Sequence, residues 1–158
     1  TAAALAIKRY KKLDSDEALE KYLNKQCGFL GVSGESDDMR EVMRLRDEGD
    51  KRSTFALALY TYRIQTAIGQ MAASLGGVDA IVFTATIGER SDEMRQAVTN
   101  KLAYLGFGLD EEKNVGEMPN RHTDIAAEGS KPIYVIRTDE SEEMIRRAKI
   151  ILDGENRG

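Results

Sequence analysis

Cysteine, histidine, proline and tryptophan are scarce in this sequence of 158 residues, which contains one cysteine, one histidine, two prolines and no tryptophan. A single cysteine excludes an internal disulfide and a cysteine-rich zinc site. No apolar run approaches the ~18 residues of a membrane-spanning helix. The net charge of -4 is not the basic excess that a nucleic-acid surface requires. We therefore expect a cytoplasmic protein that binds neither membrane nor nucleic acid, with Cys27 as a small buried hydrophobic residue.

The remaining composition, 41% hydrophobic and 32% charged, is typical of a globular protein, and the length fits one domain, 1–158. Apolar spacing and cap residues predict helices that begin at Asp14, Ser36, Asp50, Ser91 and Asp139. The longest should run from Asp50 to a glycine pair at 76–77. Apolar runs predict strands at 78–83 and 133–136, a short strand near 123–126, and a turn with an extended piece at 27–33. The pattern is that of an α/β protein.

The stretch at 76–91 organises this prediction. Its apolar run at 78–83 predicts a buried, central and parallel strand. Small and hydroxylated residues follow, among them Gly88, and Ser91 is placed to cap the next helix. A helix that starts after a strand and a tight loop attracts phosphates, so a nucleotide is the first ligand to consider. Such units are also common where no ligand binds, so a purely structural interpretation stays open.

Two acidic turns and one histidine are further candidates. Asp38 and Arg40 are two residues apart, and their spacing favours a helix cap over a shared ligand. Glu140 follows a predicted strand, where a carboxylate can face phosphates through Mg²⁺ or can simply start a helix. His122 has no second ligand nearby in the sequence, which favours a solvated loop. No Walker A loop, dinucleotide fingerprint or nucleophile elbow is present.

Five ordered segments resemble the acetate kinase family, which belongs to the actin-like superfamily that includes sugar kinases. Residues 24–33 are similar to the family's Asn-Lys-x-Ser-Gly-Leu-Leu-Gly-x-Ser, and 36–40 to its Ser-Ser-Asp-x-Arg. Residues 76–90 resemble Gly-Gly-Val-Asp-Ala-Ile-Val-Phe-Thr-Gly-Gly-Ile-Gly-Glu-Asn. The segment at 105–114 and Thr-Asp-Glu at 138–140 also match. The resemblance covers nearly the whole chain, but only the C-terminal half of such a kinase.

The resemblance implies an α/β fold, the C-terminal lobe of an actin-like ATPase or ribonuclease H-like fold, with a central sheet flanked by helices. It implies that 1–158 is a nucleotide-binding lobe without its N-terminal lobe. The implied reaction is reversible phosphoryl transfer from ATP to acetate, which gives acetyl phosphate and ADP with Mg²⁺ or Mn²⁺ as cofactor. The implied nucleotide-binding residues are Asp38, Met39, Arg40, Thr86, Ile87, Gly88, Glu89 and Arg90. Glu140 is implied as the catalytic and metal-linked acid.

The sequence departs from the family at several of these positions. Ala85 and Thr86 replace a glycine pair, Arg90 replaces asparagine, and Asp37 replaces serine. Two alternatives to an acetate kinase remain. One is a kinase for propionate or another short-chain carboxylate, because the resemblance places the acid pocket mainly in the half that this chain does not cover. The other is a non-catalytic module that binds nucleotide or dimerises, which the altered glycine pair favours. The resemblance also implies a homodimer, with the long helix from Asp50 at or near its interface.

Overall fold

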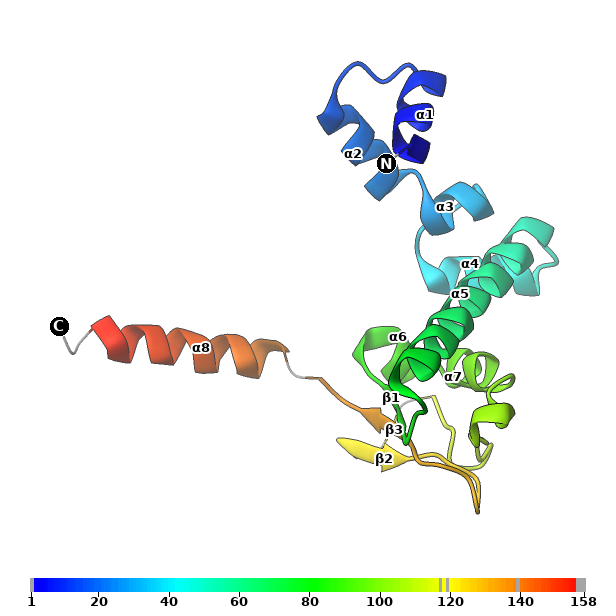
Figure 1. Ribbon diagram of the computed structural model, residues 1–158, viewed down its shortest axis with the longest axis vertical. Helices are drawn as coiled ribbons and strands as arrows, with labels where there is room; N and C mark the ends of the chain where they lie inside the picture. The colour runs from blue at the N-terminus through cyan, green and yellow to red at the C-terminus, as the bar shows by residue number, and fades with distance from the viewer. Residues whose placement is uncertain (1, 117, 119, 139, 156–158) are drawn as a thin grey trace. The chain divides into compact units, whose positions relative to one another are not determined.

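The computed structural model describes residues 2–116, 118, 120–138 and 140–155. It divides into two compact units, Thr1–Ile64 and Gln65–Gly158. The first unit is helical and contains α1 (Ala2–Tyr10), α2 (Asp16–Lys25), α3 (Gly28–Ser33), α4 (Met39–Asp47) and the first half of α5 (Lys51–Leu75), as Figure 1 shows. The second unit contains the sheet. None of the helices in the described part of the chain is long and apolar enough to cross a membrane.

Two helices of the first unit begin at cap residues that differ from the predicted ones. The N-cap of α2 is Ser15, not Asp14, and its Oγ accepts a hydrogen bond from the backbone N of Ala18 at 3.0 Å. The N-cap of α4 is Asp38, not Ser36. Ser36 instead accepts a hydrogen bond from the backbone N of Asp38 at 3.0 Å. Each cap is the acceptor that directly precedes its helix, where its carboxylate or hydroxyl reaches the free N–H groups of the first turn.

Residues 28–33 form a helix, α3, where the sequence predicted a turn and an extended piece. The helix ends at Gly34, which has a φ of +79° and donates its backbone N–H to the carbonyl of Leu30 at 2.7 Å. The ring of Phe29 packs edge-on against Tyr60 of α5, with centroids 5.6 Å apart. This packing outweighs the weak helix propensity of a segment with two glycines. Cys27, just before α3, is half-buried rather than buried.

The longest predicted helix is confirmed as α5, which spans 25 residues. Its start is capped by Asp50, whose Oδ1 accepts a hydrogen bond from the backbone N of Ser53 at 2.7 Å. At 1.5 Å per residue the helix is ~37 Å long. It ends before the glycine pair, where Gly76 has a φ of +73° and Gly77 a φ of +147°. Backbone of this kind suits glycine, which carries no Cβ to clash.

Three short strands form the sheet of the second unit in the order β1-β3-β2 (Figure 1). Strand β1 (Ile81–Phe83) runs parallel to β3 (Ile133–Ile136), with Ile81 beside Ile133, and β2 (His122–Asp124) runs antiparallel to β3. The parallel pairing is as predicted. The central, buried position predicted for 78–83 is wrong: among the described strands β3 is central, and Val82 of β1 is 51% exposed. An apolar run indicates burial without specifying how many strands flank it, and the fully buried Ile133 and Val135 take the middle position.

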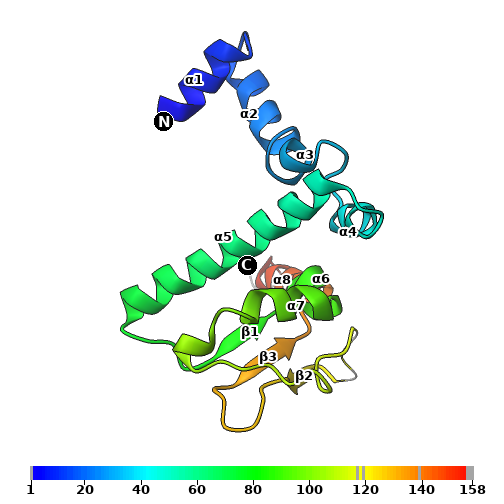
Figure 2. The same cartoon turned by 90° about the vertical axis from the view of Figure 1, so that its right-hand side faces the viewer.

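Helices flank the sheet, as expected from the α/β pattern. The flanking helices are α6 (Ala85–Arg90) and α7 (Asp92–Thr99). Helix α8 (Glu140–Glu155) follows β3 in the chain, and a 3₁₀ turn, η1, lies at Ala103–Leu105. Figure 2 shows α6 and α7 beside the strands. Ser91 caps α7 as predicted and accepts a hydrogen bond from the backbone N of Met94 at 3.2 Å. The buried core of this unit includes Met94, Val98, Leu102, Phe107, Ile125, Ile133 and Val135. The predicted apolar stripe of α8 is exposed, for example 71% at Met144.

Candidate functional site

The turn after β1 is a short helix rather than a tight loop. Thr84 stands as the N-cap of α6, with no side-chain capping hydrogen bond, and α6 starts directly at Ala85. Ala85 has a φ of +60°, a backbone conformation that costs an L-residue with a Cβ about 1 to 2 kcal/mol. Gly88 lies close under β1, because a Cβ added there would meet the backbone of Phe83 at 3.4 Å. The small residue at position 88 therefore allows α6 to pack closely against the strand.

A buried arginine, Arg95, is hydrogen-bonded to this turn. Arg95 of α7 is 0% exposed, and it donates hydrogen bonds to the carbonyl of Gly88 and to Oδ1 of Asn114, each at 2.8 Å, and to the carbonyl of Val115. Asn114 in turn donates to the carbonyl of Asp92 at 2.9 Å. Burial lowers the pKa of the Arg95 guanidinium, and the Asp92 carboxylate acts in the opposite direction. One side chain thus joins α6, α7 and the segment at 114–115.

The sequence analysis did not single out Arg95, although a signal for it was present. Arg95 lies three and seven residues before Val98 and Leu102, which places a charged residue on the apolar face of an amphipathic helix. A buried charge must be paired or hydrogen-bonded, so such a position indicates a polar partner elsewhere in the chain. That partner, Asn114, is 19 residues away and could not be identified from helical spacing.

Glu89 of α6 reaches the start of α8. Its Oε1 accepts two hydrogen bonds from Thr138, one from the backbone N and one from Oγ1, both at 2.9 Å. The backbone N–H of Thr138 is the main reason that the pKa of Glu89 is lowered, and partial burial opposes it. Because β1 and β3 are parallel, both turns lie at the carboxyl ends of their strands. This is the edge at which open α/β sheets carry their ligands.

The remaining predicted residues of this turn vary in exposure. Thr86 and Arg90 are exposed, whereas Ile87 and Gly88 are partly buried. The first turn of α7 carries Asp92 and Glu93, which already complement the positive end of that helix.

Asp38, Met39 and Arg40 lie in the first unit, at the start of α4. Oδ1 of Asp38 accepts a hydrogen bond from the backbone N of Arg40 at 2.8 Å, and Oδ2 accepts one from Nη2 of the same arginine at 2.7 Å. This pairing lowers the pKa of Asp38 to about 2. Arg40 thus folds back onto the cap, while its side chain remains 89% exposed. Met39 is the first residue of α4 and is partly buried.

Glu140 is the first residue of α8, but its side chain lies outside the described part of the structure, as does Asp139. The helix start predicted at Asp139 therefore lies outside the described residues. Glu142 forms an ion pair with Arg121 at 3.3 Å. Among the described residues no three histidine, cysteine or acidic side chains are grouped to hold a metal. His122, predicted in a solvated loop, is exposed but belongs to β2.

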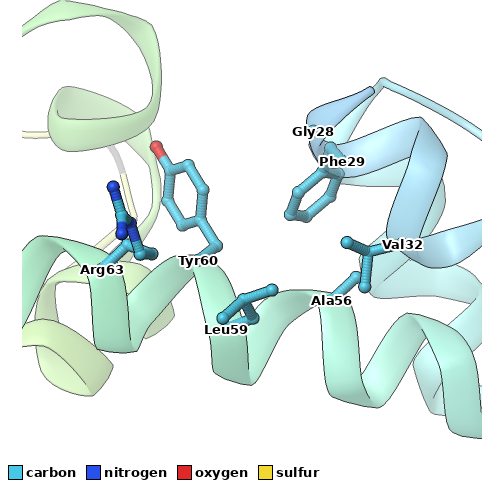
Figure 3. A pocket seen from close by; sticks show the side chains of 7 residues that line it. All are labelled: Gly28, Phe29, Val32, Ala56, Leu59, Tyr60 and Arg63. Carbon is cyan, nitrogen blue, oxygen red and sulfur yellow. The ribbon is translucent and has the colours of Figure 1, made fainter. Parts of the chain in front are cut away.

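An apolar pocket of about 430 Å³ lies in the first unit between α3 and α5. Figure 3 shows the rings of Phe29 and Tyr60 at this pocket, with the side chain of Arg63 beside Tyr60. The other lining residues are Gly28, Val32, Ala56 and Leu59. None of the predicted site residues lines it, so this pocket is not where the sequence placed the nucleotide.

Comparison with known proteins decides the family. Residues 2–147 match the sequence model of the acetokinase family. The chain belongs to the acetokinase family. This member is 44% identical over 135 residues to an acetate kinase of Desulfitobacterium hafniense, and the match covers 85% of the chain but 33% of that protein. The chain thus spans about a third of the length of the curated relatives that it matches.

Solved structures of acetokinase-family relatives have the same fold as this member. The crystal structure of Porphyromonas gingivalis acetate kinase matches with a TM-score of 0.84 and 32% identity, over 96% of this chain and 38% of that one. A propionate kinase from Francisella tularensis matches with a TM-score of 0.75 and 34% identity, over 88% and 35%. The predicted family and the α/β fold class are therefore confirmed.

Proposed function

We propose that this chain is the C-terminal, nucleotide-binding lobe of an acetate kinase. The reaction is reversible transfer of the γ-phosphoryl group of ATP to acetate, which gives acetyl phosphate and ADP. Beside the family membership, one observation carries this proposal: the hydrogen bonds from Thr138 to Glu89 join the turn at 86–90 to the start of α8. The two segments proposed for the nucleotide and the metal-linked acid thus meet at the carboxyl ends of two parallel strands.

In this proposal the side chain of Glu89 binds Thr138 rather than the nucleotide. The nucleotide is bound by the other residues of the turn, Thr86, Ile87, Gly88 and Arg90, and the adenosine site is lined by Asp38, Met39 and Arg40. Glu140 is the acid that faces the metal. Mg²⁺ is commonly held by one or two carboxylates together with substrate phosphates rather than by a cage of protein ligands. When bound, Mg²⁺ or Mn²⁺ would neutralise charge on the phosphates during transfer.

The chain's own part in catalysis is to position the nucleotide. Phosphoryl transfer depends mostly on holding the donor and acceptor in line and on stabilising charge. Arg95 holds the turn through its hydrogen bond to the carbonyl of Gly88, and the hydrogen bonds from Thr138 to Glu89 join the turn to the segment before α8. A second copy of the chain is the proposed partner, as a homodimer.

A second candidate function is propionate kinase. The likeness to the Francisella tularensis propionate kinase favours it, at an identity similar to that of the acetate kinase structure. Both reactions transfer a phosphoryl group to a carboxylate, and the acceptors differ by one methylene. One methylene in a pocket changes discrimination by only about 1 to 3 kcal/mol.

The test uses the longest natural polypeptide that contains this chain. Acyl phosphate is trapped as the hydroxamate after incubation with Mg·ATP and either acetate or propionate. We expect the higher kcat/KM with acetate. A higher kcat/KM with propionate would establish the second candidate, and nucleotide binding without either product would identify a non-catalytic binding module.

A further inference from the structure

The side chain of Glu89 is engaged inside the protein. Its Oε1 is the acceptor of both hydrogen bonds from Thr138, and the backbone N–H of Ala85 also helps to lower its pKa. Each interaction ties the carboxylate to a backbone or hydroxyl donor of this chain. A carboxylate held in this way offers little to a nucleotide, whose phosphates it would repel.

The base from which Glu89 reaches out is itself fixed. Gly88, the preceding residue, packs under Phe83 and accepts a hydrogen bond from the buried Arg95 at 2.8 Å. The backbone from which the Glu89 side chain extends is therefore held in place. The carboxylate of Glu89 contacts Thr138, which lies in the segment that follows β3.

Thr138 is two residues from Glu140, the first residue of α8. Groups that act on a metal or a reacting phosphate must be held to within about 0.5 Å of the productive geometry. The two hydrogen bonds to Glu89 hold the backbone N–H and the hydroxyl of Thr138 in place. The exposed apolar residues of α8 provide little packing to do so, since Met144 is 71% and Ile145 56% exposed.

We propose that Glu89 is a positioning residue that holds the start of α8 through Thr138, and that it does not contact the nucleotide. The effect on Glu140 rests on the proposed function, whereas the hold on Thr138 does not. The role predicts which property of Glu89 matters. A tether needs a hydrogen-bond acceptor, and the amide oxygen of glutamine is also an acceptor, although a weaker one.

Three variants separate a tether from a charge. Glu89→Gln keeps the acceptor and removes the charge, whereas Glu89→Ala removes both. Thr138→Val removes the hydroxyl donor and keeps the shape and the backbone N–H. Glu128→Ala, at an exposed position of the same unit, is the matched control for loss of a surface carboxylate.

The first measurement needs neither nucleotide nor metal. Hydrogen–deuterium exchange is followed in the longest natural polypeptide that contains the chain, on peptides that cover residues 133–143. We expect exchange at the Thr138 amide to rise at least ~10-fold in Glu89→Ala and less than ~3-fold in Glu89→Gln, with the Glu128→Ala control unchanged. Unchanged exchange in Glu89→Ala would overturn the proposal.

The second measurement is phosphoryl transfer by the same proteins. We expect Glu89→Ala to lower kcat and to raise the Mg²⁺ concentration for half-maximal rate, with KM for acetate unchanged. Glu89→Gln should stay close to wild type, and the effects of Glu89→Ala and Thr138→Val should be non-additive. Equal losses in the Gln and Ala variants would overturn the proposal, because they would assign the role to the charge. If wild type makes no acyl phosphate but shows the expected exchange, the tether stands and the proposed function fails.

Discussion

Replacing Arg95 tests whether the support beneath the turn depends on hydrogen bonds or on charge. The guanidinium is fully buried and donates to three neutral acceptors: the carbonyls of Gly88 and Val115, and Oδ1 of Asn114. Arg95→Met fills a similar volume and provides no donor. Arg95→Lys keeps the charge on a single nitrogen, which cannot reproduce the planar fork of a guanidinium.

The magnitude follows from the groups left without a donor. Each buried acceptor that loses its hydrogen bond costs about 1 to 3 kcal/mol. Three such losses are partly offset in Arg95→Met, because a charge no longer has to be buried. We therefore expect Arg95→Met to lower the free energy of unfolding by about 3 kcal/mol. Arg95→Lys should cost at least as much, since it still buries the charge but satisfies fewer acceptors.

The assay is urea unfolding followed by circular dichroism, in the longest natural polypeptide that contains the chain. Arg90→Met, at an exposed position of α6, is the control and should change stability by less than about 0.5 kcal/mol. A lysine variant within 1 kcal/mol of wild type would show that charge alone suffices. A methionine variant this close to wild type would show that the hydrogen bonds contribute nothing net, and either result refutes the reasoning.

The remaining predictions concern a strained residue, a helix cap, the acid at the start of α8 and the isolated chain. Ala85→Gly should raise the free energy of unfolding by roughly 0.5 to 1 kcal/mol, because glycine adopts the φ of +60° without strain. The control, Ala97→Gly inside α7, should lower it by about 1 kcal/mol. A lower free energy of unfolding for Ala85→Gly, measured by urea unfolding, would contradict this prediction. Asp38→Ala and Arg40→Ala should each weaken nucleotide binding in calorimetry and shift the melting temperature by only a few degrees, and unchanged affinity with a large shift would leave Asp38 only its capping role. Since the pKa of Asp38 is lowered to about 2, its stabilisation is complete above its ordinary value of 3.8 and is lost as pH falls through 2, so the melting temperatures of wild type and Asp38→Ala should converge there. Glu140→Gln should lower turnover at least ~10²-fold with little change in melting temperature, and near-normal turnover at saturating Mg²⁺ and ATP would make Glu140 only a helix-start acid. The isolated 158 residues should fold without forming acetyl phosphate, and ATP-dependent product from them alone would contradict that expectation.

The elements that were predicted correctly are those whose signals are local. The 25 residues of α5, the strand at β3 and the cap at Ser91 follow from periodicity and from side chains within one turn of the element. Helix caps were harder to place where several acceptors are adjacent, as at residues 14–16 and 36–38. There the N-cap lies one or two residues later than expected, at Ser15 and Asp38.

Contacts between distant segments account for the remaining differences. The helix α3 depends on packing of Phe29 against Tyr60, which its own glycine-rich sequence does not indicate. The edge position of β1 depends on which strand becomes its neighbour. The residues of the candidate site lie in motifs that the sequence shows. The hydrogen bonds from Thr138 to Glu89, however, join positions 49 residues apart. Helix and strand periodicity cannot predict a contact over this separation.

The parallel pairing of β1 with β3 has a consequence for the order of folding. The turn after β1 is complete in the chain long before its partner, because Ile81 pairs with Ile133. Closing a loop of this length is an entropic cost that must be met before the contacts across it can stabilise anything. During synthesis, residues 84–90 therefore lack the hydrogen bonds between Glu89 and Thr138 until Thr138 has left the ribosome. We therefore expect the candidate site to be among the last parts of the second unit to form. If translation stops before Thr138, the turn at 84–90 cannot be joined to the segment before α8.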